Sequence, residues 1–176
     1  LGGFHGTFLP QRSLDEFEHM DYVIAGEGEI AFTRLVAALR RGEPSPEIPG
    51  VWHRGQGGGN AGRGEIMDDL NQLDPPAWHL FDQGDMAKYC RSIPIMSQRG
   101  CPFGCNFCSR PYGRVVRQMD PVAVVDHIVH CMGSLGATNF QFYDETFTVK
   151  KNHVANICQG IIERGLDVRW NALVHA

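Results

Sequence analysis

The residues with the clearest capacity for chemistry are three closely spaced cysteines, Cys101, Cys105 and Cys108. Their spacing is Cys-x3-Cys-x2-Cys, and they follow shortly after an apolar run at 93–96. Three thiolates held this close together can share one metal cluster. A 4Fe–4S cube has four iron corners and normally takes four thiolates, so three of them leave one iron open. An open metal position usually indicates catalysis, as it does in zinc enzymes.

Two other uses of these cysteines need consideration. Cys105 and Cys108 form a Cys-x-x-Cys pair, which is typical of redox motifs, but that interpretation leaves Cys101 unexplained. A structural zinc site would need a fourth ligand, commonly from a second cysteine pair, and the sequence holds no second pair. The other cysteines stand alone, and we interpret them as small apolar residues: Cys90, Cys131 and Cys158.

Composition excludes several classes of partner. The chain has 176 residues, 43% of them hydrophobic, with 16 basic and 20 acidic side chains and a net charge of −4. No stripe of Lys and Arg indicates nucleic-acid binding, and no run of 18 apolar residues predicts a membrane span. Cysteines with metal-type spacing favour a reducing compartment, so we expect a cytoplasmic location. Because the first residue is not Met and both ends look cut, we expect a piece of a longer polypeptide.

The elements that must position these cysteines fall into two α/β units, at 1–67 and 90–176, joined by a proline-rich linker at 68–89. In the first unit, Ser13 and Glu16 form a capping box that predicts a short helix. A buried strand is expected at 21–25 and a helix from Ile30 to Arg40, where apolar residues recur with helical period. A hairpin is expected between 51–54 and 65–67, around a glycine-rich loop at 55–64.

The linker contains Pro75 and Pro76, which block regular structure and make a stiff connector. Its large apolar side chains are expected to dock it onto both units: Trp78, Leu80 and Phe81.

The second unit alternates strands and helices. Strands are expected at 93–98, 139–143 and 168–174, with one helix capped by Asp120 and started by Pro121, and another ended by Gly165. This order implies a parallel sheet with right-handed crossovers. Ligands of such sheets bind at the carboxyl ends of the strands. The cysteine loop and the pair Asp144 and Glu145 both follow strands, which predicts a shared site.

The cysteine run, with Phe107 before its last cysteine, resembles the cluster loop of the radical S-adenosylmethionine (SAM) enzymes, Cys-x3-Cys-x-aromatic-Cys. The resemblance implies a 4Fe–4S cluster on the three cysteines, with SAM bound to the open iron through its amino and carboxylate groups. Electron transfer from a flavodoxin- or ferredoxin-type donor would then cleave a C–S bond of SAM and release a 5′-deoxyadenosyl radical. It also implies Phe107, Asp144 and Glu145 as residues that bind SAM.

The front of the chain is similar to the last part of a cobalamin-binding Rossmann-like domain. The similarity lies in the motifs Gly-Gly-x-His-x-Thr-x-x-Pro at 2–10 and Asp-Tyr-Val-x-x-Gly-Glu-Gly-Glu at 21–29. The segments 48–50 and 76–78 also resemble the cobalamin-dependent radical SAM class. Taken alone, each glycine motif is equally consistent with a plain turn. The resemblance implies cobalamin binding by seven residues: Gly2, Gly3, His5, Thr7, Gly26, Glu27 and Gly28.

Together these motifs resemble the cobalamin-dependent radical SAM enzymes over nearly the whole chain. The implied fold is α/β: the end of a Rossmann-like cobalamin-binding domain, then the first half of a partial TIM-like (β/α) barrel. The implied reaction on a small-molecule substrate is methyl transfer to an unactivated carbon, or oxidative cyclisation of the anaerobic Mg-protoporphyrin ester cyclase type. A zinc-stabilised binding module without catalysis is the alternative of another class. The sequence departs from the family at His127 and His175, where relatives often have Glu and Arg.

Overall fold

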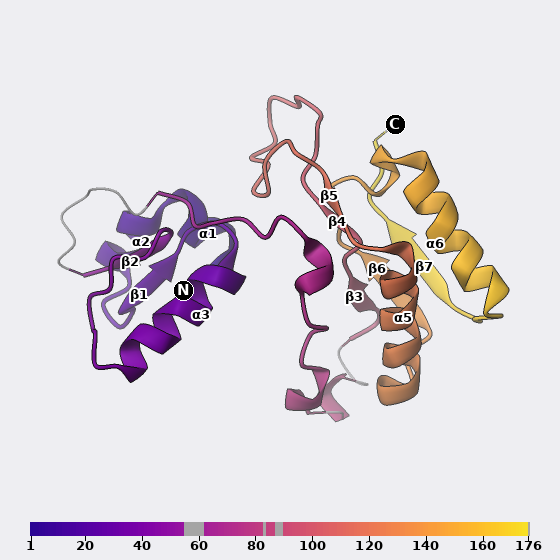
Figure 1. Ribbon diagram of the computed structural model, residues 1–176, viewed down its shortest axis with the longest axis horizontal. Coiled ribbons are helices and arrows are strands. Elements are labelled where there is room, and N and C mark those ends of the chain that lie inside the picture. Colours follow the sequence, from indigo (N-terminus) through magenta and orange to yellow (C-terminus); the bar gives the residue numbers. More distant parts are fainter. Residues whose placement is uncertain (55–61, 83, 87–89, 176) are drawn as a thin grey trace. The chain divides into compact units, whose positions relative to one another are not determined.

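The computed structural model describes residues 1–54, 62–82, 84–86 and 90–175 (Figure 1). The chain divides into two compact units, Leu1–Asp68 and Asp69–Ala176. Most of the predicted glycine-rich loop at 55–64 lies outside the described residues.

The first unit contains three helices and two strands among its described residues: α1 (Gly3–Phe8), α2 (Pro10–Glu16), β1 (Tyr22–Ile24), α3 (Gly28–Arg40) and β2 (Val51–His53). The predicted strand at 21–25 and the predicted helix at 30–40 are both confirmed. The apolar face of α3 packs Ala31 and Leu35 against Val51 of β2. This contact gives the unit a small core behind its two strands.

The hairpin predicted between 51–54 and 65–67 is wrong. β2 pairs antiparallel with β1 instead, with Val23 opposite Trp52, and 65–67 form no strand. The chain after the loop crosses the end of β1, where the Gly64 amide donates to the Ala25 carbonyl at 2.9 Å. Gly50 makes this crossing possible, because a Cβ there would lie 2.4 Å from the backbone of Gly64.

The capping box predicted at Ser13 and Glu16 is also wrong. Ser13 lies inside α2, and its hydroxyl donates to the carbonyl of Leu9 at 2.8 Å. The helix starts earlier because Pro10 occupies its first turn, where the fixed φ of proline fits and no amide proton is needed.

The second unit is built on a parallel sheet with strand order β3-β6-β7. Its elements are η1 (Leu70–Gln72), η2 (Trp78–Leu80), β3 (Ile93–Ile95), β4 (Gln98–Arg99), β5 (Arg117–Gln118), α5 (Pro121–Leu135), β6 (Asn139–Phe142), η3 (Phe147–Val149), α6 (Lys151–Glu163) and β7 (Arg169–Ala172). Helices α5 and α6 lie side by side along the sheet (Figure 1). The predicted strand–helix–strand–helix–strand order and its parallel pairing are confirmed. Ile95, Phe142, Ile128 and Ile157 are fully buried between the sheet and these helices.

Helix α5 begins where its sequence predicts. The Asp120 side chain accepts a hydrogen bond from the amide of Val122, and Pro121 is the first helical residue. Gly136 ends the helix in the left-handed conformation, with φ +63°. The chain then turns directly into β6.

Trp78 docks the linker onto the second unit. Trp78 is buried in the core of this unit, and its indole Nε1 donates to Nε2 of His127 at 3.4 Å. Leu80 and Phe81 are exposed, so the prediction that they dock with Trp78 is wrong. The 3-10 turn of η2 turns the indole inward and leaves these two neighbours outside.

No helix in the described part of the chain is both long enough and apolar enough to cross a lipid bilayer.

Candidate functional site

A two-stranded ribbon holds the cysteine loop. The predicted strand at 93–98 is in fact two strands, because the chain leaves β3 after Ile95 and pairs β4 antiparallel with β5. The loop at 100–116 projects from the end of this ribbon (Figure 1). Its start requires glycine, since Gly100 has φ +92° and a Cβ there would lie 2.1 Å from the Val115 carbonyl oxygen. The next amide, that of Cys101, donates to the carbonyl of Gly113 at 3.1 Å and closes the loop.

The three cysteines differ in exposure along this loop. All are free thiols: Cys101 is buried, Cys105 is partly exposed and Cys108 is exposed. Among the described residues no three His, Cys, Asp or Glu side chains are gathered as a single metal ion would require. A 4Fe–4S cube offers a separate iron corner to each thiolate, so a cluster does not need three sulfurs to meet at one ion. Three free thiols in one closed loop therefore form a donor set that fits a cluster.

Asp144 joins the end of β6 to the start of the ribbon. Its Oδ1 accepts from the amides of Ser97 at 2.8 Å and Gln98 at 3.1 Å, and its Oδ2 accepts from the Ser97 hydroxyl at 2.6 Å. The side chain is fully buried. Burial raises the pKa of Asp144, although the bonds from Ser97 and Gln98 act in the opposite direction. Because both oxygens are engaged, the observed contacts favour a positioning role, and the predicted contact with SAM stays a prediction.

His153 on α6 extends this network and was not foreseen from the sequence. Its Nε2 lies 3.2 Å from the Ser97 hydroxyl oxygen. Since the single hydroxyl proton is donated to Asp144, Nε2 of His153 must be the donor in this contact. Burial lowers the pKa of His153, opposed by its interactions with Ser97 and Asp120. A lone histidine on a helix gave no signal that it would meet this network.

Glu145 lies against both ends of the cysteine loop. Its two carboxylate oxygens are buried and have no hydrogen-bond partner of normal geometry among the described residues. Burial raises its pKa. Groups of the loop act in the opposite direction, namely the nearby amides of Gly100 and Tyr112 and the charges of Arg110 and Arg117. The predicted proximity of a carboxylate to the cysteine loop is thus observed for Glu145, which retains its capacity to accept hydrogen bonds.

Two aromatic contacts concern the loop. Phe107 lies in the turn before Cys108 with its side chain 90% exposed, so its ring face is open to a ligand. The imidazole of His175, which follows β7, stacks on the ring of Phe103 with centroids 4.0 Å apart. The sequence identified His175 only as a departure from the family. In the structure, the His175 side chain joins the segment after β7 to the cysteine loop.

The residues predicted to bind cobalamin are partly brought together in the first unit. The amide of Gly26, just after β1, donates to the hydroxyl of buried Thr7 at 3.0 Å. Buried Glu27 accepts from the amide of Met67 at 3.3 Å. The remaining residues have open space around them or are exposed: Gly2, Gly3, His5 and Gly28. Thr7 therefore contacts the chain itself through its hydroxyl, and its predicted contact with cobalamin stays a prediction.

The cysteines outside the loop match their prediction only in part. Cys131 on α5 is fully buried, and burial raises the pKa of its thiol to about 11. Cys158 on α6 is partly exposed. Cys90 is exposed, so its interpretation as a buried apolar residue is wrong; its Sγ lies 3.6 Å from Sδ of Met86.

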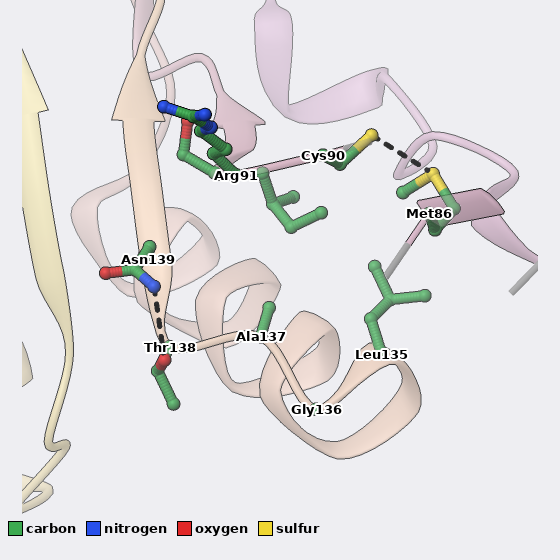
Figure 2. Close-up of a pocket in the computed structure, with 10 residues that line it drawn as sticks. Met86, Cys90, Arg91, Leu135, Gly136, Ala137, Thr138 and Asn139 are labelled. Carbon is green, nitrogen blue, oxygen red and sulfur yellow. Dashed lines mark hydrogen bonds between the residues drawn. The ribbon is translucent and has the colours of Figure 1, made fainter. Parts of the chain in front are cut away.

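A cavity of about 260 Å³ lies at the other end of the parallel strands (Figure 2). It is lined by the segments that precede β3 and β6: residues 86, 90–93 and 135–139. The cysteine loop and Glu145 follow the carboxyl ends of these strands. The cavity is therefore separate from the site.

Curated relatives match almost the whole chain. An uncharacterised methyltransferase of Pyrococcus horikoshii is 31% identical over 98% of this chain and 38% of its own length. The anaerobic magnesium-protoporphyrin IX monomethyl ester cyclase of Cereibacter sphaeroides is 30% identical over 97% of this chain and 29% of its own. The chain thus spans about a third of the length of these relatives. No family model matches the chain.

Solved structures share the fold. The cobalamin-dependent SAM radical enzyme OxsB, solved with aqua-cobalamin and SAM, superimposes with a TM-score of 0.77 at 17% identity, over 96% of this chain and 25% of that one. The radical SAM methyltransferase TsrM of Kitasatospora setae, solved with cobalamin and a [4Fe–4S] cluster, gives a TM-score of 0.70 at 20% identity, over 93% of this chain and 33% of that one. The resemblance to cobalamin-dependent radical SAM enzymes predicted from the sequence is confirmed.

Proposed function

Because this chain resembles cobalamin-dependent radical SAM enzymes along nearly its whole length, we propose that it carries part of the active site of such an enzyme. The observation that carries the proposal is the closed loop with three free cysteines, held at the carboxyl end of a parallel sheet beside Glu145, whose carboxylate oxygens are buried. Ligand sites of parallel α/β folds lie at this end. The curated relatives, a methyltransferase and a cyclase, support the same class.

In the proposed site, Cys101, Cys105 and Cys108 hold a 4Fe–4S cluster and leave one iron for SAM. When bound, such a cluster would supply an electron that cleaves a C–S bond of SAM to a 5′-deoxyadenosyl radical. The chain provides the frame: the β4–β5 ribbon fixes the loop, and Asp144 ties the ribbon to β6. The buried side of the loop, at Cys101, keeps water from one face of the site.

Glu145 is the proposed acceptor for the ammonium or ribose hydroxyls of SAM. Its buried carboxylate oxygens have no hydrogen-bond partner of normal geometry among the described residues, and a buried charge gains most from a charged partner. Phe107 is proposed to pack on the adenine, as aromatic side chains stack on bases. Its exposed ring leaves a face free for this contact.

The proposal also covers the fold of each unit and the binding of cobalamin. The first unit would be the end of a Rossmann-like cobalamin-binding domain, and the second would be the first half of a partial (β/α) barrel. The cobalamin would lie against the segment around Gly26 to Gly28 and the start of α1. Open space around Gly2, Gly3 and Gly28 is compatible with the close approach of a large ligand.

Methyl transfer to an unactivated carbon of a small molecule is the proposed outcome, and cyclisation of the kind named for the Cereibacter relative is the second candidate. The proposal includes a flavodoxin- or ferredoxin-type electron donor and a cytoplasmic location, because free thiols and iron–sulfur clusters suit a reducing compartment. We further propose that this chain, which spans about a third of the length of the curated relatives, is inactive alone.

Anaerobic reconstitution with iron and sulfide tests the proposal. We expect a brown protein whose reduced cluster gives an electron paramagnetic resonance (EPR) signal that changes when SAM is added, since SAM would bind the open iron. A zinc-stabilised binding module would remain colourless after the same treatment and would retain zinc. An EPR signal of the cluster that does not change when SAM is added would contradict the proposal that one iron is open to SAM.

A further inference from the structure

The buried cysteine of the loop contacts one hydroxyl group. Sγ of Cys101 lies 3.3 Å from Oγ1 of Thr146, the second residue after Asp144. Both side chains are buried, with 8% of Cys101 and 6% of Thr146 exposed. In a buried environment a hydrogen bond to sulfur is electrostatically stronger than in water. This contact is therefore stronger than the same contact would be at an exposed cysteine such as Cys108.

Thr146 has one proton and two neighbouring acceptors. Its Oγ1 lies 2.7 Å from the carbonyl oxygen of Glu145, to which it donates when Cys101 is a thiol. The thiol of Cys101 then donates to the hydroxyl oxygen, which completes a short chain of hydrogen bonds. A cysteine that ligates iron has lost its proton. The hydroxyl would then direct an oxygen lone pair at a negatively charged sulfur unless its own proton turned toward that sulfur.

The backbone of Thr146 is fixed by other bonds, so the hydroxyl cannot simply move away. The carbonyl of Thr146 accepts from the side-chain amide of buried Gln98 at 2.6 Å. Oε1 of Gln98 in turn accepts from the side chain of Gln118 at 3.0 Å, across the ribbon. Phe147 is buried and packs on Phe142 with ring centroids 4.5 Å apart. The simplest response to a thiolate is therefore rotation of the O–H bond toward the sulfur.

We propose that Thr146 donates a hydrogen bond to the sulfur of Cys101 when the cluster is bound, and that it thereby raises the reduction potential of the cluster. The proposal rests on the function proposed above. A hydrogen bond to a ligating sulfur withdraws electron density and stabilises the reduced, more negative cluster. Bonds of this kind are among the factors that set the potentials of iron–sulfur clusters.

The test is a redox titration of the reconstituted protein, followed by the EPR signal of the reduced cluster. Thr146→Val removes the hydroxyl and keeps the shape of the side chain, and Thr146→Ser keeps the hydroxyl as the matched control. We expect Thr146→Val to contain as much iron as the wild type but to have a more negative midpoint potential. The midpoint of Thr146→Ser should stay close to that of the wild type.

Equal midpoints for the valine variant and the wild type, with the cluster intact in both, would overturn the proposal and leave the proposed function standing. Absence of any cluster in the wild type would instead contradict the proposed function. If Thr146→Val binds no iron, Thr146→Ala is titrated in its place. The wild type is also compared in H₂O and D₂O by resonance Raman spectroscopy. Iron–sulfur stretching frequencies that do not shift in D₂O would refute an exchangeable donor without any variant.

Discussion

Replacing Asp144 by alanine should destabilise the second unit far more than replacing it by asparagine. In Asp144→Ala the buried amides of Ser97 and Gln98 lose their acceptor. Leaving a buried donor unsatisfied costs about 1–3 kcal/mol, so two amides give a loss of roughly 2–6 kcal/mol in the free energy of unfolding. The Ser97 hydroxyl adds little, because it can donate to Nε2 of His153, 3.2 Å away, once the imidazole moves its proton to Nδ1.

Asp144→Asn keeps the oxygen that accepts from the two amides. Its side-chain nitrogen would donate to the Ser97 hydroxyl, which would then donate to Nε2 of His153 once the imidazole moves its proton to Nδ1. The number of hydrogen bonds is preserved, so we expect a loss below about 1.5 kcal/mol. The difference in stability between the two variants therefore measures the contribution of the hydrogen bonds that the side chain of Asp144 accepts.

The assay is unfolding in urea, followed by tryptophan fluorescence in a Trp52→Phe background, where only Trp78 and Trp170 of the second unit report. Asp126→Ala is the control, because its ion pair with Arg164 is exposed and should contribute at most about 1 kcal/mol. A free energy of unfolding for Asp144→Ala within about 0.5 kcal/mol of the wild type would refute the reasoning. Equal losses for the alanine and asparagine variants would refute it as well.

Three further perturbations have defined outcomes. Gly100→Ala should lose bound iron, because its φ of +92° is strained for alanine and the new Cβ would meet a carbonyl oxygen at 2.1 Å, whereas Gly104→Ala, with space around it, should keep normal iron content. Burial lowers the pKa of His153, so the native state binds fewer protons than the unfolded state, and stability present above about pH 6.5 is lost as the pH falls toward the native pKa. The free energy of unfolding, measured by urea titrations at several pH values, should depend less on pH in His153→Gln, by at most ~1.4 kcal/mol per pH unit. An unchanged dependence on pH would contradict the lowered pKa of His153. Glu145→Gln should weaken SAM binding about ten- to a hundred-fold in calorimetry, by the roughly 1.5–3 kcal/mol of a charged hydrogen bond, and wild-type affinity would exclude Glu145 from the SAM site.

Periodicity and capping patterns predicted the second unit well. Asp120, Pro121 and the apolar face of α5 act locally, so the sequence around them determines the helix. The parallel order of β3, β6 and β7 followed from the alternation of strands and helices. The first unit was predicted less well, since β2 pairs with a strand far before it in the chain rather than with the segment after its loop.

The candidate site was predicted in its ligand residues but not in its supporting contacts. Cysteine spacing is a local signal, and the position of Glu145 followed from the rule that parallel strands end at one edge. The contacts of His153 with Ser97 and of Thr146 with Cys101 join residues about 45 to 56 positions apart. Such contacts depend on tertiary packing, which no spacing pattern in the sequence reveals.

The central claim is that Cys101, Cys105 and Cys108 together hold one iron–sulfur cluster. Iron analysis of single alanine variants after anaerobic reconstitution tests it most directly, with Cys131→Ala and Cys158→Ala as matched controls elsewhere in the second unit. The account predicts about four iron atoms per chain in the wild type and both controls, and a loss of iron and brown colour in each loop variant. Wild-type iron content and colour in Cys105→Ala would contradict it.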